Sequence, residues 1–419
     1  MKGGRRVPTD EIGQAWFPFS EDSPEEDTDV ARRWNFTFID LFAGIGGFRI
    51  ALEGLGGRCV FSCEIDDHAR RTYSQWFGED PQDTKRFAKD IRQVENDSPD
   101  CIRIPKHDLL AAGFPCQPFS LAGVSKKNSL GRPHGFACQE QGNLFLDIIR
   151  IAERRKSPAL LLENVKYLLR HDRGRTWNRI TCELSAAGYV VLHQVIDARY
   201  WVPQHRERIF IAAFRKDMLP PAVLRDLERR QGSPEPFRIR PPRKAPVLAD
   251  ILEENPDAKY TLSPRLWQYL QAYRAKHERL GNGFGFGLVD PRIDTVTRTL
   301  SARYHKDGSE ILIGRKGPHG EPMPDHRPRR LTPVECARLM GFSEKVENRN
   351  DIPVSDTQAY RQFGNALVPA VARAVARFVL EKLENAGLVS QADTNTKTHP
   401  DSRTAPTRPA PGRDSVPAR

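Results

Sequence analysis

The feature that most limits the fold of this chain is a regular alternation of short apolar segments with helix-forming segments. The apolar segments read NFTFIDLF, CVFSCEID, HDLLAAGF, PALLLENV, YVVLHQVIDA and ERIFIAAF. Between several of them lie segments with apolar residues at helical spacing or a closing glycine, at 46–57, 142–155 and 174–188. Strands that alternate with helices predict an α/β fold, in which helices cover both faces of a mostly parallel sheet.

Composition limits the number of domains, the cellular compartment and the class of partner. The 419 residues allow one large or two modest domains. No run of about 18 apolar residues is present, so we expect no membrane span, and the start MKGGRRVPTDEIG lacks the apolar core of a secretory signal. Seven cysteines without a C-x-x-C pair indicate reduced thiols in a cytoplasmic protein, and argue against disulfides or a metal site. The net charge of +11 favours a polyanionic partner, either nucleic acid or an anionic membrane.

The two ends of the chain differ from this alternating part. Residues 1–35 are polar and charged, and residues 387–419 are rich in Pro, Ser, Thr and Arg with almost no apolar residue to bury. We therefore expect a flexible leader over 1–35 and a disordered tail over 387–419. The α/β pattern itself occupies 36–215.

The middle of the chain has a third character. From residue 216 the sequence becomes basic and rich in proline and glycine, which predicts an inserted second domain over 216–328. Inside it, Asp307-Gly308 predicts the turn of a hairpin. Helical character returns over 329–386, where Thr332, Pro333 and Glu335 form an N-cap and capping-box signature.

A glycine-rich turn follows the first predicted strand, in FIDLFAGIGGFR at 38–49. Such a turn lets a ligand approach the backbone at the carboxyl end of a sheet, although its G-x-G-G spacing departs from the dinucleotide fingerprint. Glu64 ends the second strand, where a carboxylate can accept both hydroxyls of a ribose. Asp90 follows a third expected strand and can meet an adenine amino group. The turn alone also fits a tight strand–helix connection, but together with Glu64 it indicates a nucleoside-cofactor site.

One cysteine lies on a stiff turn in AAGFPCQPFS. Pro115 and Pro118 fix their own φ angles and bias the residues before them away from helical geometry. Cys116 is therefore presented by the backbone at a strand end, where α/β folds place their ligands. The alternative is an inert thiol, which is the usual fate of a cysteine.

Charged residues end two further segments. In LLLENV, Glu163 follows three leucines, and partial desolvation would raise its pKa so that it acts as an acid near neutral pH. In VPQHRERIF, Arg206 and Arg208 alternate and face one side of an extended segment. Two such cations can orient a carboxylate, hold a phosphate or merely solvate an edge, and Glu163 can also be a solvated strand end.

Together these residues suit one reaction. A thiol nucleophile and a neutral carboxylic acid fit an electron-poor ring, because the acid protonates a ring nitrogen as sulfur adds to carbon. On cytosine, sulfur would add at C6 and the proton would go to N3. C5 then becomes nucleophilic enough to take the methyl group of S-adenosylmethionine, after which a base removes the C5 proton and the thiol leaves.

The motifs FIDLFAGIGGFR, GFPCQPFS, ENV, QHRER and RQFGNALVP occur in the order found in the DNA (cytosine-5)-methyltransferases. Over most of residues 36–384 the chain resembles this family, in its bacterial restriction–modification form. The resemblance implies a Rossmann-like S-adenosylmethionine-dependent methyltransferase fold, with Cys116 as the nucleophile and Glu163 as the N3 acid. Arg206 and Arg208 would hold the base and the acid in place.

The resemblance also implies the cofactor site. Glu64 would bind the ribose with Ile65 beside it, and Asp90 with Ile91 would bind the adenine. The methionine moiety and the remaining walls of the pocket would be contacted by residues of four other motifs: Phe42, Gly44, Ile45, Gly46, Gly47, Gly113, Pro115, Asn143, Leu144, Asn365 and Ala366. The family usually has serine where this chain has Ala366, so we expect only a backbone contact there.

In the family the last helix returns to the first domain, and the variable insert recognises the target. We accordingly expect 216–328 to be a target-recognition domain that binds the major groove and phosphates of duplex DNA. The expected DNA contacts are Gln117, Ser120, Arg303, Tyr304 and Lys306. The target cytosine must be flipped out of the duplex to reach Cys116. We expect a monomer, with a cognate restriction endonuclease that shares the target sequence without binding this chain.

Three other functions would account for parts of this pattern. A tRNA cytosine-5 methyltransferase would use the same motifs, but the long basic insert favours duplex DNA. A cysteine-dependent hydrolase would need a histidine paired with the thiol, and it would leave Glu64 and the glycine loop without a role. A catalytically inactive DNA-binding regulator would have no need of Cys116, Glu163 and both arginines together.

Overall fold

The computed structural model describes residues 32–115, 143–281, 285–314 and 327–392. Three of the predicted site residues, Cys116, Gln117 and Ser120, lie outside this part of the chain.

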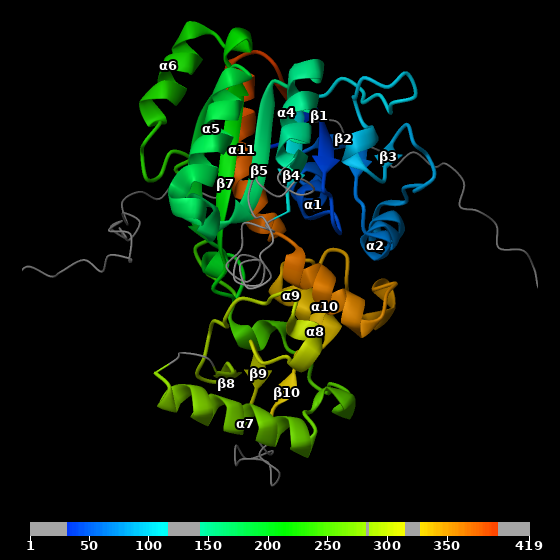
Figure 1. Cartoon of the computed structure of the whole chain (residues 1–419), viewed down its shortest axis with the longest axis vertical. Helices are drawn as coiled ribbons and strands as arrows, with labels where there is room; N and C mark the ends of the chain where they lie inside the picture. The colour runs from blue at the N-terminus through cyan, green and yellow to red at the C-terminus, as the bar shows by residue number, and fades with distance from the viewer. Residues whose placement is uncertain (1–31, 116–142, 282–284, 315–326, 393–419) are drawn as a thin grey trace, which may run out of the picture.

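The upper part of the molecule in Figure 1 is built on one sheet. Its main strands are β1 (Trp34–Leu41), β2 (Gly57–Cys63), β3 (Phe87–Ala88), β4 (Leu109–Gly113), β5 (Ala159–Val165), β6 (Tyr189–Asp197) and β7 (Glu207–Arg215). They lie in the order β3-β2-β1-β4-β5-β7-β6. The pairs among β1 to β5 are parallel, and β7 runs antiparallel to β5 and β6. The predicted α/β fold with a mostly parallel sheet is confirmed.

Successive residues of each strand face two separate apolar layers, as a period of two requires. Phe38 of β1 belongs to one layer and Ile39 to the other. Figure 1 shows α4 and α5 in front of the sheet and α11 behind it. The layer with Phe38 is covered by α1 (Gly47–Glu53), α6 (Pro221–Arg230) and α11 (Pro369–Asn385), and the layer with Ile39 by α4 (Asn143–Arg155) and α5 (Arg175–Ala186). Because α11 packs on α1, the C-terminal part of the chain returns to the sheet, as the family resemblance implies.

The lower part of the molecule in Figure 1 is smaller and less regular. Its three-stranded sheet has the order β10-β9-β8 and consists of β8 (Leu288–Val289), β9 (Leu312–Ile313) and β10 (Arg329–Arg330). The helices around it are α7 (Pro264–Arg279), α8 (Tyr304–Asp307), α9 (Pro333–Leu339) and α10 (Asp356–Asn365). Thr332 caps α9, and the Thr332 N–H donates to the Glu335 carboxylate, so the predicted capping box is confirmed.

The predicted hairpin at Asp307-Gly308 is wrong. Residues Tyr304–Asp307 form the short helix α8, and Gly308 ends it with φ 67°. A glycine in the left-handed region stops a helix as readily as it turns a hairpin. The local sequence therefore could not distinguish the two structures.

Two predicted boundaries also differ from the structure. Helix α6 lies inside the predicted insert, yet its Leu227 is buried in the layer that covers the large sheet, and Asp226 pairs with Lys382 of α11 at 2.8 Å. At the other end, β11 (Ser390–Gln391) falls in the predicted tail but pairs antiparallel with Trp34 and Asn35. Trp34, placed in the predicted leader, is 1% exposed.

The span Asp356–Asn385 is long and apolar enough to pass for a membrane helix by length and composition. It comprises two helices, α10 and α11, which are separated at residues 366–368, and most of its apolar window is buried inside the protein. Burial of this kind is what the core helices of a soluble domain show.

Candidate active site

Several of the predicted catalytic and cofactor residues lie at the carboxyl edge of the large sheet. Leu41 at the end of β1 pairs with Cys63 of β2 on one side, and its neighbour on the other side is Ala112 of β4. Gly113 of β4 pairs with Glu163 of β5. Four features therefore lie side by side at the edge where α/β folds bind ligands. They are the glycine loop after β1, Glu64 after β2, the segment after β4 that leads toward Cys116, and Glu163 near the end of β5.

The glycine loop after β1 is open on one side. Gly44 has φ 55°, and Phe42 has φ 55° as well, which is unusual for a bulky side chain. A Cβ atom added to Gly44 would meet nothing within 4 Å. This face of the loop can therefore receive a ligand directly against the backbone.

The second half of the loop is closed by packing. Gly46 has φ 87°, and a Cβ atom there would lie 2.3 Å from Cε2 of Phe77. A Cβ atom on Gly47 would lie 2.9 Å from Cγ of Leu367, and Ile45 is 2% exposed. Gly46 and Gly47 thus allow close packing against Phe77 and Leu367, whereas the side of the loop at Gly44 stays open.

Glu64 joins the loop to the end of β2. Its Oε2 accepts the Gly44 N–H at 2.8 Å, and its Oε1 accepts the Asp66 N–H at 2.7 Å. Burial raises the pKa of the Glu64 carboxyl above its usual range, while these two N–H groups oppose the shift. Ile65 beside it is 58% exposed and offers an apolar surface at the same edge.

Asp90 and Ile91 follow β3. The Asp90 carboxylate caps the short helix η2 (Ile91–Gln93) by accepting the Arg92 N–H at 3.0 Å, and it pairs with the Arg92 guanidinium at 2.6 Å. These bonds to Arg92 hold the pKa of Asp90 below its usual range. Asp90 therefore stays an anionic acceptor, and the Ile91 side chain is buried beneath it.

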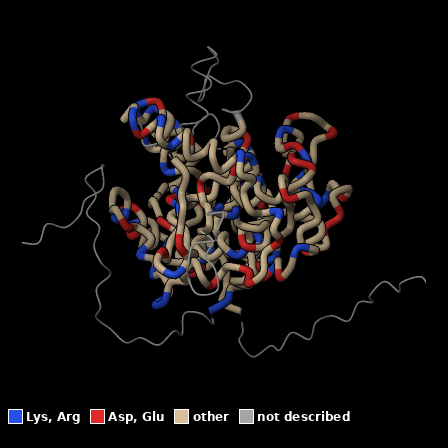
Figure 2. The backbone as a smooth tube through the Cα atoms, turned by 90° about the horizontal axis from the view of Figure 1, so that it is seen from below, with Lys and Arg blue, Asp and Glu red and all other residues tan. Residues whose placement is uncertain are grey.

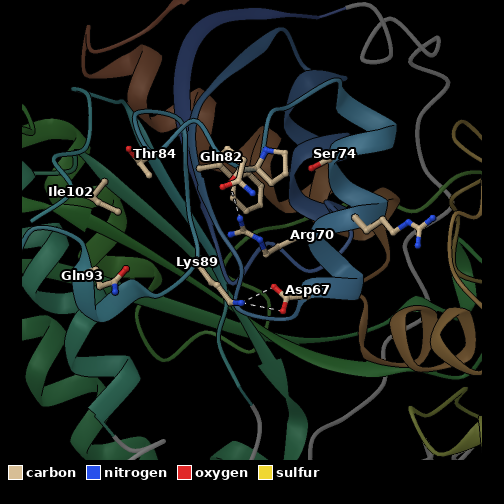
Figure 3. A pocket seen from close by; sticks show the side chains of 11 residues that line it. Asp67, Arg70, Ser74, Gln82, Thr84, Lys89, Gln93 and Ile102 are labelled. Carbon is tan, nitrogen blue, oxygen red and sulfur yellow. Dashed lines mark hydrogen bonds and ion pairs between the residues drawn. The ribbon is translucent and has the colours of Figure 1, made fainter.

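A separate hollow borders this end of the site (Figure 3). Its volume is about 610 Å³, and it lies between α2 (Asp67–Phe77), residues 81–84 and β3. Lys89 pairs with Asp67 at 2.8 Å, and Arg70 donates to the Pro81 carbonyl at 2.6 Å. The predicted cofactor residues do not line this hollow, so it is a neighbour of the cofactor site rather than part of it.

Glu163 lies at the end of β5 with its side chain 12% exposed. Arg208 Nε approaches Glu163 Oε1 at 3.2 Å. A Cβ atom on Gly113 would lie 3.8 Å from Oε2, so the neighbouring strand leaves room around the acid. Burial raises the pKa of Glu163 above its usual range, and the charges of Arg208 and Arg206 oppose this shift. A carboxyl in this setting can keep its proton at a higher pH than a solvated glutamate.

Arg206 makes contacts other than the predicted ones to the base and the acid. It influences Glu163 through its charge, but its guanidinium donates to backbone carbonyls at Leu300 (2.8 Å), Gly364 (3.0 Å) and Ala366 (2.7 Å). Arg206 as a whole is 1% exposed. Arg208 thus contacts the Glu163 carboxyl. Arg206, just before β7, instead joins this strand to the smaller lower part of the molecule in Figure 1, called the second unit below, and to the predicted cofactor motif at Asn365-Ala366.

Arg206→Lys is expected to lower the free energy of unfolding by about 2–4 kcal/mol. One ammonium group cannot reach three carbonyls in fork geometry, and buried acceptors would lose their donor. Urea unfolding measures the effect, with Arg179→Lys on α5 as the control because that arginine is 61% exposed. Equal unfolding midpoints for the two variants would contradict the role given to Arg206.

Asn164 is a site residue that the sequence did not single out. It is 1% exposed, and its Nδ2 donates to the Phe114 carbonyl at 3.1 Å. This bond fixes the chain two residues before Cys116. The only signal in the sequence was its place beside Glu163 in ENV, which says nothing of a contact 50 residues away.

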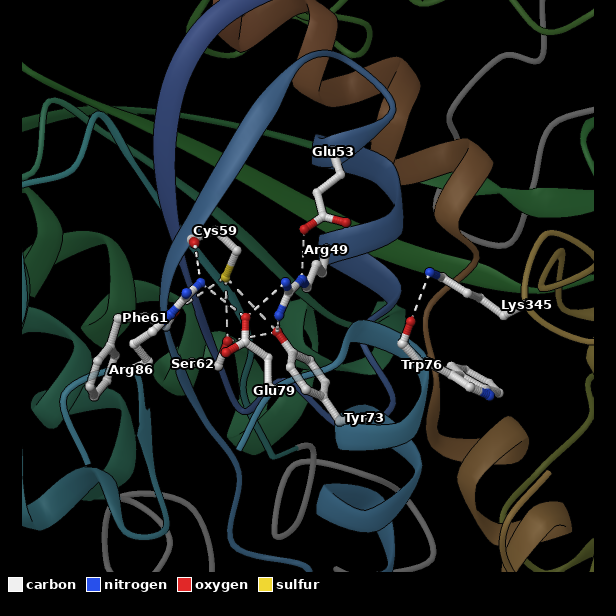
Figure 4. A network of polar contacts seen from close by, with 10 residues as sticks. All are labelled: Arg49, Glu53, Cys59, Phe61, Ser62, Tyr73, Trp76, Glu79, Arg86 and Lys345. Carbon is white, nitrogen blue, oxygen red and sulfur yellow. Dashed lines mark hydrogen bonds and ion pairs between the residues drawn. The ribbon is translucent and has the colours of Figure 1, made fainter. Parts of the chain in front are cut away.

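A buried arginine supports the glycine loop from behind (Figure 4). Arg49 of α1 pairs with Glu79 at 2.9 Å and donates to the Tyr73 hydroxyl at 3.3 Å. Its guanidinium lies 4.4 Å from the ring centroid of Phe77, the ring that closes over Gly46. The contact is a cation–π pair, and it fixes α1 against α2 beneath the loop.

Gly46→Ala is expected to lower the free energy of unfolding by about 1–3 kcal/mol more than Gly78→Ala does. Both glycines have positive φ, so both variants bear the backbone cost of about 1–2 kcal/mol. Only Gly46 adds a clash with Phe77, whereas a Cβ atom on Gly78 meets nothing within 4 Å. Thermal unfolding and cofactor titration of both variants measure this, and equal losses would show that the ring does not close the loop.

The remaining predicted cofactor residues lie at element ends. Asn143 begins α4, and Leu144 packs partly buried against the layer with Ile39. Asn365 ends α10 and is exposed, and Ala366 caps that helix. Their contact with a cofactor is a prediction that the geometry permits.

The predicted DNA contacts in the second unit divide into two kinds. Arg303 and Lys306 are exposed and stay predictions. Tyr304 is 0% exposed, and its hydroxyl donates to the Ile311 carbonyl at 2.7 Å, so the prediction of a DNA contact through Tyr304 is wrong. Its place in a polar segment hid the fact that α8 turns the ring into the core.

The carboxyl edge fits an S-adenosylmethionine molecule. The backbone over Gly44 is open, a carboxylate at Glu64 stands where ribose hydroxyls need acceptors, and Ile65 offers an exposed apolar side chain. Asp90 supplies an anionic acceptor beyond it. The residues present therefore fit a nucleoside cofactor in their polarity and in their order along the edge.

Residues 36–381 match the family model described as C-5 cytosine-specific DNA methylase. A DNA-cytosine methyltransferase of Escherichia coli K12 is 48% identical over 389 residues, which cover 85% of this chain and 80% of that protein. The type II methyltransferase M.NlaX of Neisseria lactamica is 44% identical and covers 81% of this chain and 95% of its own length. M.HpaII of Haemophilus parainfluenzae is 36% identical, and the match covers 86% of this chain and 94% of that protein.

Solved structures share the fold. A Spodoptera frugiperda DNMT2 mutant superposes with a TM-score of 0.59 at 19% identity, covering 83% of this chain and all of that one. A putative DNA modification methyltransferase encoded within an E. coli prophage gives a TM-score of 0.52 at 19% identity, with 84% of this chain covered.

Proposed function

Because this chain belongs to the C-5 cytosine-specific DNA methylase family, we propose that Cys116, together with Glu163 at the carboxyl edge of the sheet, carries out the family's reaction. The reaction transfers a methyl group from S-adenosylmethionine to C5 of cytosine in DNA. In the proposal the target cytosine is flipped out of a specific short duplex sequence into the space beside Glu163.

The proposed steps follow from the residues at the edge. The Cys116 thiolate adds to C6 while Glu163 donates its proton to N3, so that electron density reaches C5. Arg208 holds the Glu163 carboxyl in place through the 3.2 Å contact. S-adenosylmethionine, held by the loop at Gly44 and by Glu64, supplies the electrophilic methyl group. A base then removes the C5 proton, and the Cys116 sulfur leaves C6.

The observation that carries this proposal is the setting of Glu163. The acid is buried at the end of β5, its pKa is raised by that burial, and Gly113 of the strand leading to Cys116 pairs with it directly. A carboxyl that keeps its proton is what protonation of N3 requires. The hydrogen bond from Asn164 to the Phe114 carbonyl anchors the same segment.

The relatives support several further proposals. Their names as DNA and type II methyltransferases favour duplex DNA over tRNA, and favour the modification enzyme of a restriction–modification system. We propose that the protein acts as a monomer, and that a cognate endonuclease cuts the same sequence without binding this chain. Bacterial relatives also support a soluble enzyme of the cytoplasm.

Bisulfite sequencing of plasmid DNA from cells that express the protein tests the proposal. Protected cytosines should recur within one short sequence, and a Glu163→Gln culture should show fewer of them. Plasmid with no protected cytosines would count against the activity, and protection scattered over all sequences would count against a specific target.

A further inference from the structure

A buried carboxylate organises the turn between β6 and β7. Asp197 ends β6 with its side chain 1% exposed. Its Oδ1 accepts the backbone N–H groups of Arg199 (3.1 Å) and Arg206 (3.0 Å). Its Oδ2 accepts Arg199 Nε at 2.5 Å and His205 Nδ1 at 2.6 Å. Four donors thus converge on one carboxylate, as a buried charge needs.

The shared oxygen brings two basic side chains together. Arg199 and His205 both bond to Oδ2, and the guanidinium NH2 lies 3.2 Å from the imidazole Nδ1. Nδ1 must carry a hydrogen to donate to the carboxylate, so it cannot also accept one from the guanidinium. The two side chains are 40% and 47% exposed. Within the described part of the chain, Nε2 of His205 has no hydrogen-bond partner.

This pair lies where the two parts of the molecule meet. The His205 N–H donates to the Thr297 carbonyl at 2.9 Å, and the Thr299 hydroxyl donates to the His205 carbonyl at 2.6 Å. Arg208, which holds the catalytic acid, is three residues further along an extended segment, at most about 11 Å away. The backbone of His205 is therefore near the proposed base pocket.

The charges around the pair favour an anion. Asp197 is saturated by its four donors. Glu207, the next carboxylate along β7, pairs with Lys166 at 2.8 Å. The segment packed from the second unit contributes two neutral threonines and Arg298, which donates to the Gly285 carbonyl at 3.4 Å. Figure 2 shows that Lys and Arg are interspersed with Asp and Glu along the backbone. Attraction of an anion to this place therefore depends more on the two basic side chains here than on the net charge of the protein.

We propose that Arg199 and His205 form a binding site for a DNA backbone phosphate next to the flipped nucleotide. The site rests on the proposed function, because it takes the same duplex as its ligand. A neutral imidazole whose Nδ1–H faces Asp197 presents a lone pair at Nε2, which a phosphate oxygen would repel. When the phosphate enters, His205 therefore takes one proton from solvent and donates it in a hydrogen bond to the phosphate oxygen.

The test compares Arg199→Gln and His205→Gln with Arg179→Gln, which removes an exposed arginine on α5. Binding of a fluorescent target duplex is measured over a range of salt concentrations. Each site variant should weaken binding about 10-fold, which is about 1.4 kcal/mol and near the loss of one charge-assisted hydrogen bond. Each should also reduce the slope of log K against log salt by about 1. The control should keep the wild-type slope.

Three further measurements separate a phosphate contact from a structural role. Non-target duplexes should lose the same factor as the target, because phosphates carry no sequence information. The Kd for S-adenosylmethionine should be that of the wild type, and the loss in turnover should fall on KM for DNA more than on kcat.

A His205→Gln variant with the wild-type salt slope would overturn the inference. So would variants that lose cofactor binding in proportion to DNA binding, since that pattern marks a structural turn. A wild-type protein that methylates no DNA would refute the proposed function instead. The two failures are therefore distinguishable.

Discussion

Cys116→Ser is expected to abolish methyl transfer while cofactor and DNA binding persist. The serine hydroxyl is scarcely ionised at neutral pH, whereas a thiol is partly ionised and intrinsically more nucleophilic. Without addition at C6, electron density does not reach C5, and methyl transfer has no driving force. The loss should be at least about 10⁴-fold, as for other enzymes that lose a covalent nucleophile.

Transfer of a labelled methyl group to duplex DNA measures this effect. Cys182→Ser is the matched control, because Cys182 is an exposed free thiol on α5. Fluorescence titrations with the cofactor and the duplex should give wild-type Kd values for both variants. A Cys116→Ser enzyme that methylates at the wild-type rate would remove the thiol from the mechanism.

Glu163→Gln is expected to slow methyl transfer by roughly 10²–10⁴, the range for loss of a general acid. Glutamine keeps the shape of the side chain and one hydrogen-bond donor but cannot release a proton to N3. Arg208 would also lose the charge of its partner at 3.2 Å. The change should appear in kcat, because protonation of N3 matters only as sulfur adds to the ring.

The pH dependence gives this variant a second readout. Burial raises the pKa of Glu163, so the folded protein keeps this proton to a higher pH than an unfolded chain does. As the pH rises through that raised value, the acid is lost and kcat should fall on the alkaline side. Any stability that the proton contributes is lost in the same direction. Glu163→Gln should lack this alkaline limb, and the control Glu207→Gln, on β7, should keep it.

The sequence predicts the sheet well because its strands are buried on both faces. A run such as ALLL in β5 predicts a central strand that is buried on both faces. The glycines after β1 indicate the point where the chain turns toward α1. The ends of these strands then place Glu64 and Glu163 at one edge, which follows from parallel topology alone. That is why the sequence alone predicts that these two carboxylates lie at the same edge of the sheet.

What the sequence did not predict depends on contacts between distant residues. The guanidinium of Arg206 bonds to carbonyls 94 to 160 residues away, and no local pattern indicates which carbonyls those are. The same holds for Asn164 and Phe114. Tyr304 stands in a polar segment, and only the packing of α8 against α10 explains its burial. Strand β11 was missed because a two-residue strand has almost no signal of its own.

The central claim is that Cys116 bonds covalently to C6 of the target cytosine. A duplex that contains 5-fluorocytosine at the target tests it, because C5 then has no proton to lose and the sulfur cannot be eliminated. With S-adenosylmethionine present, mass spectrometry should show one protein–DNA adduct that survives denaturation and maps to Cys116. The Cys116→Ser protein should form none. Methylation of normal DNA without any adduct on the fluorinated duplex would contradict the covalent mechanism.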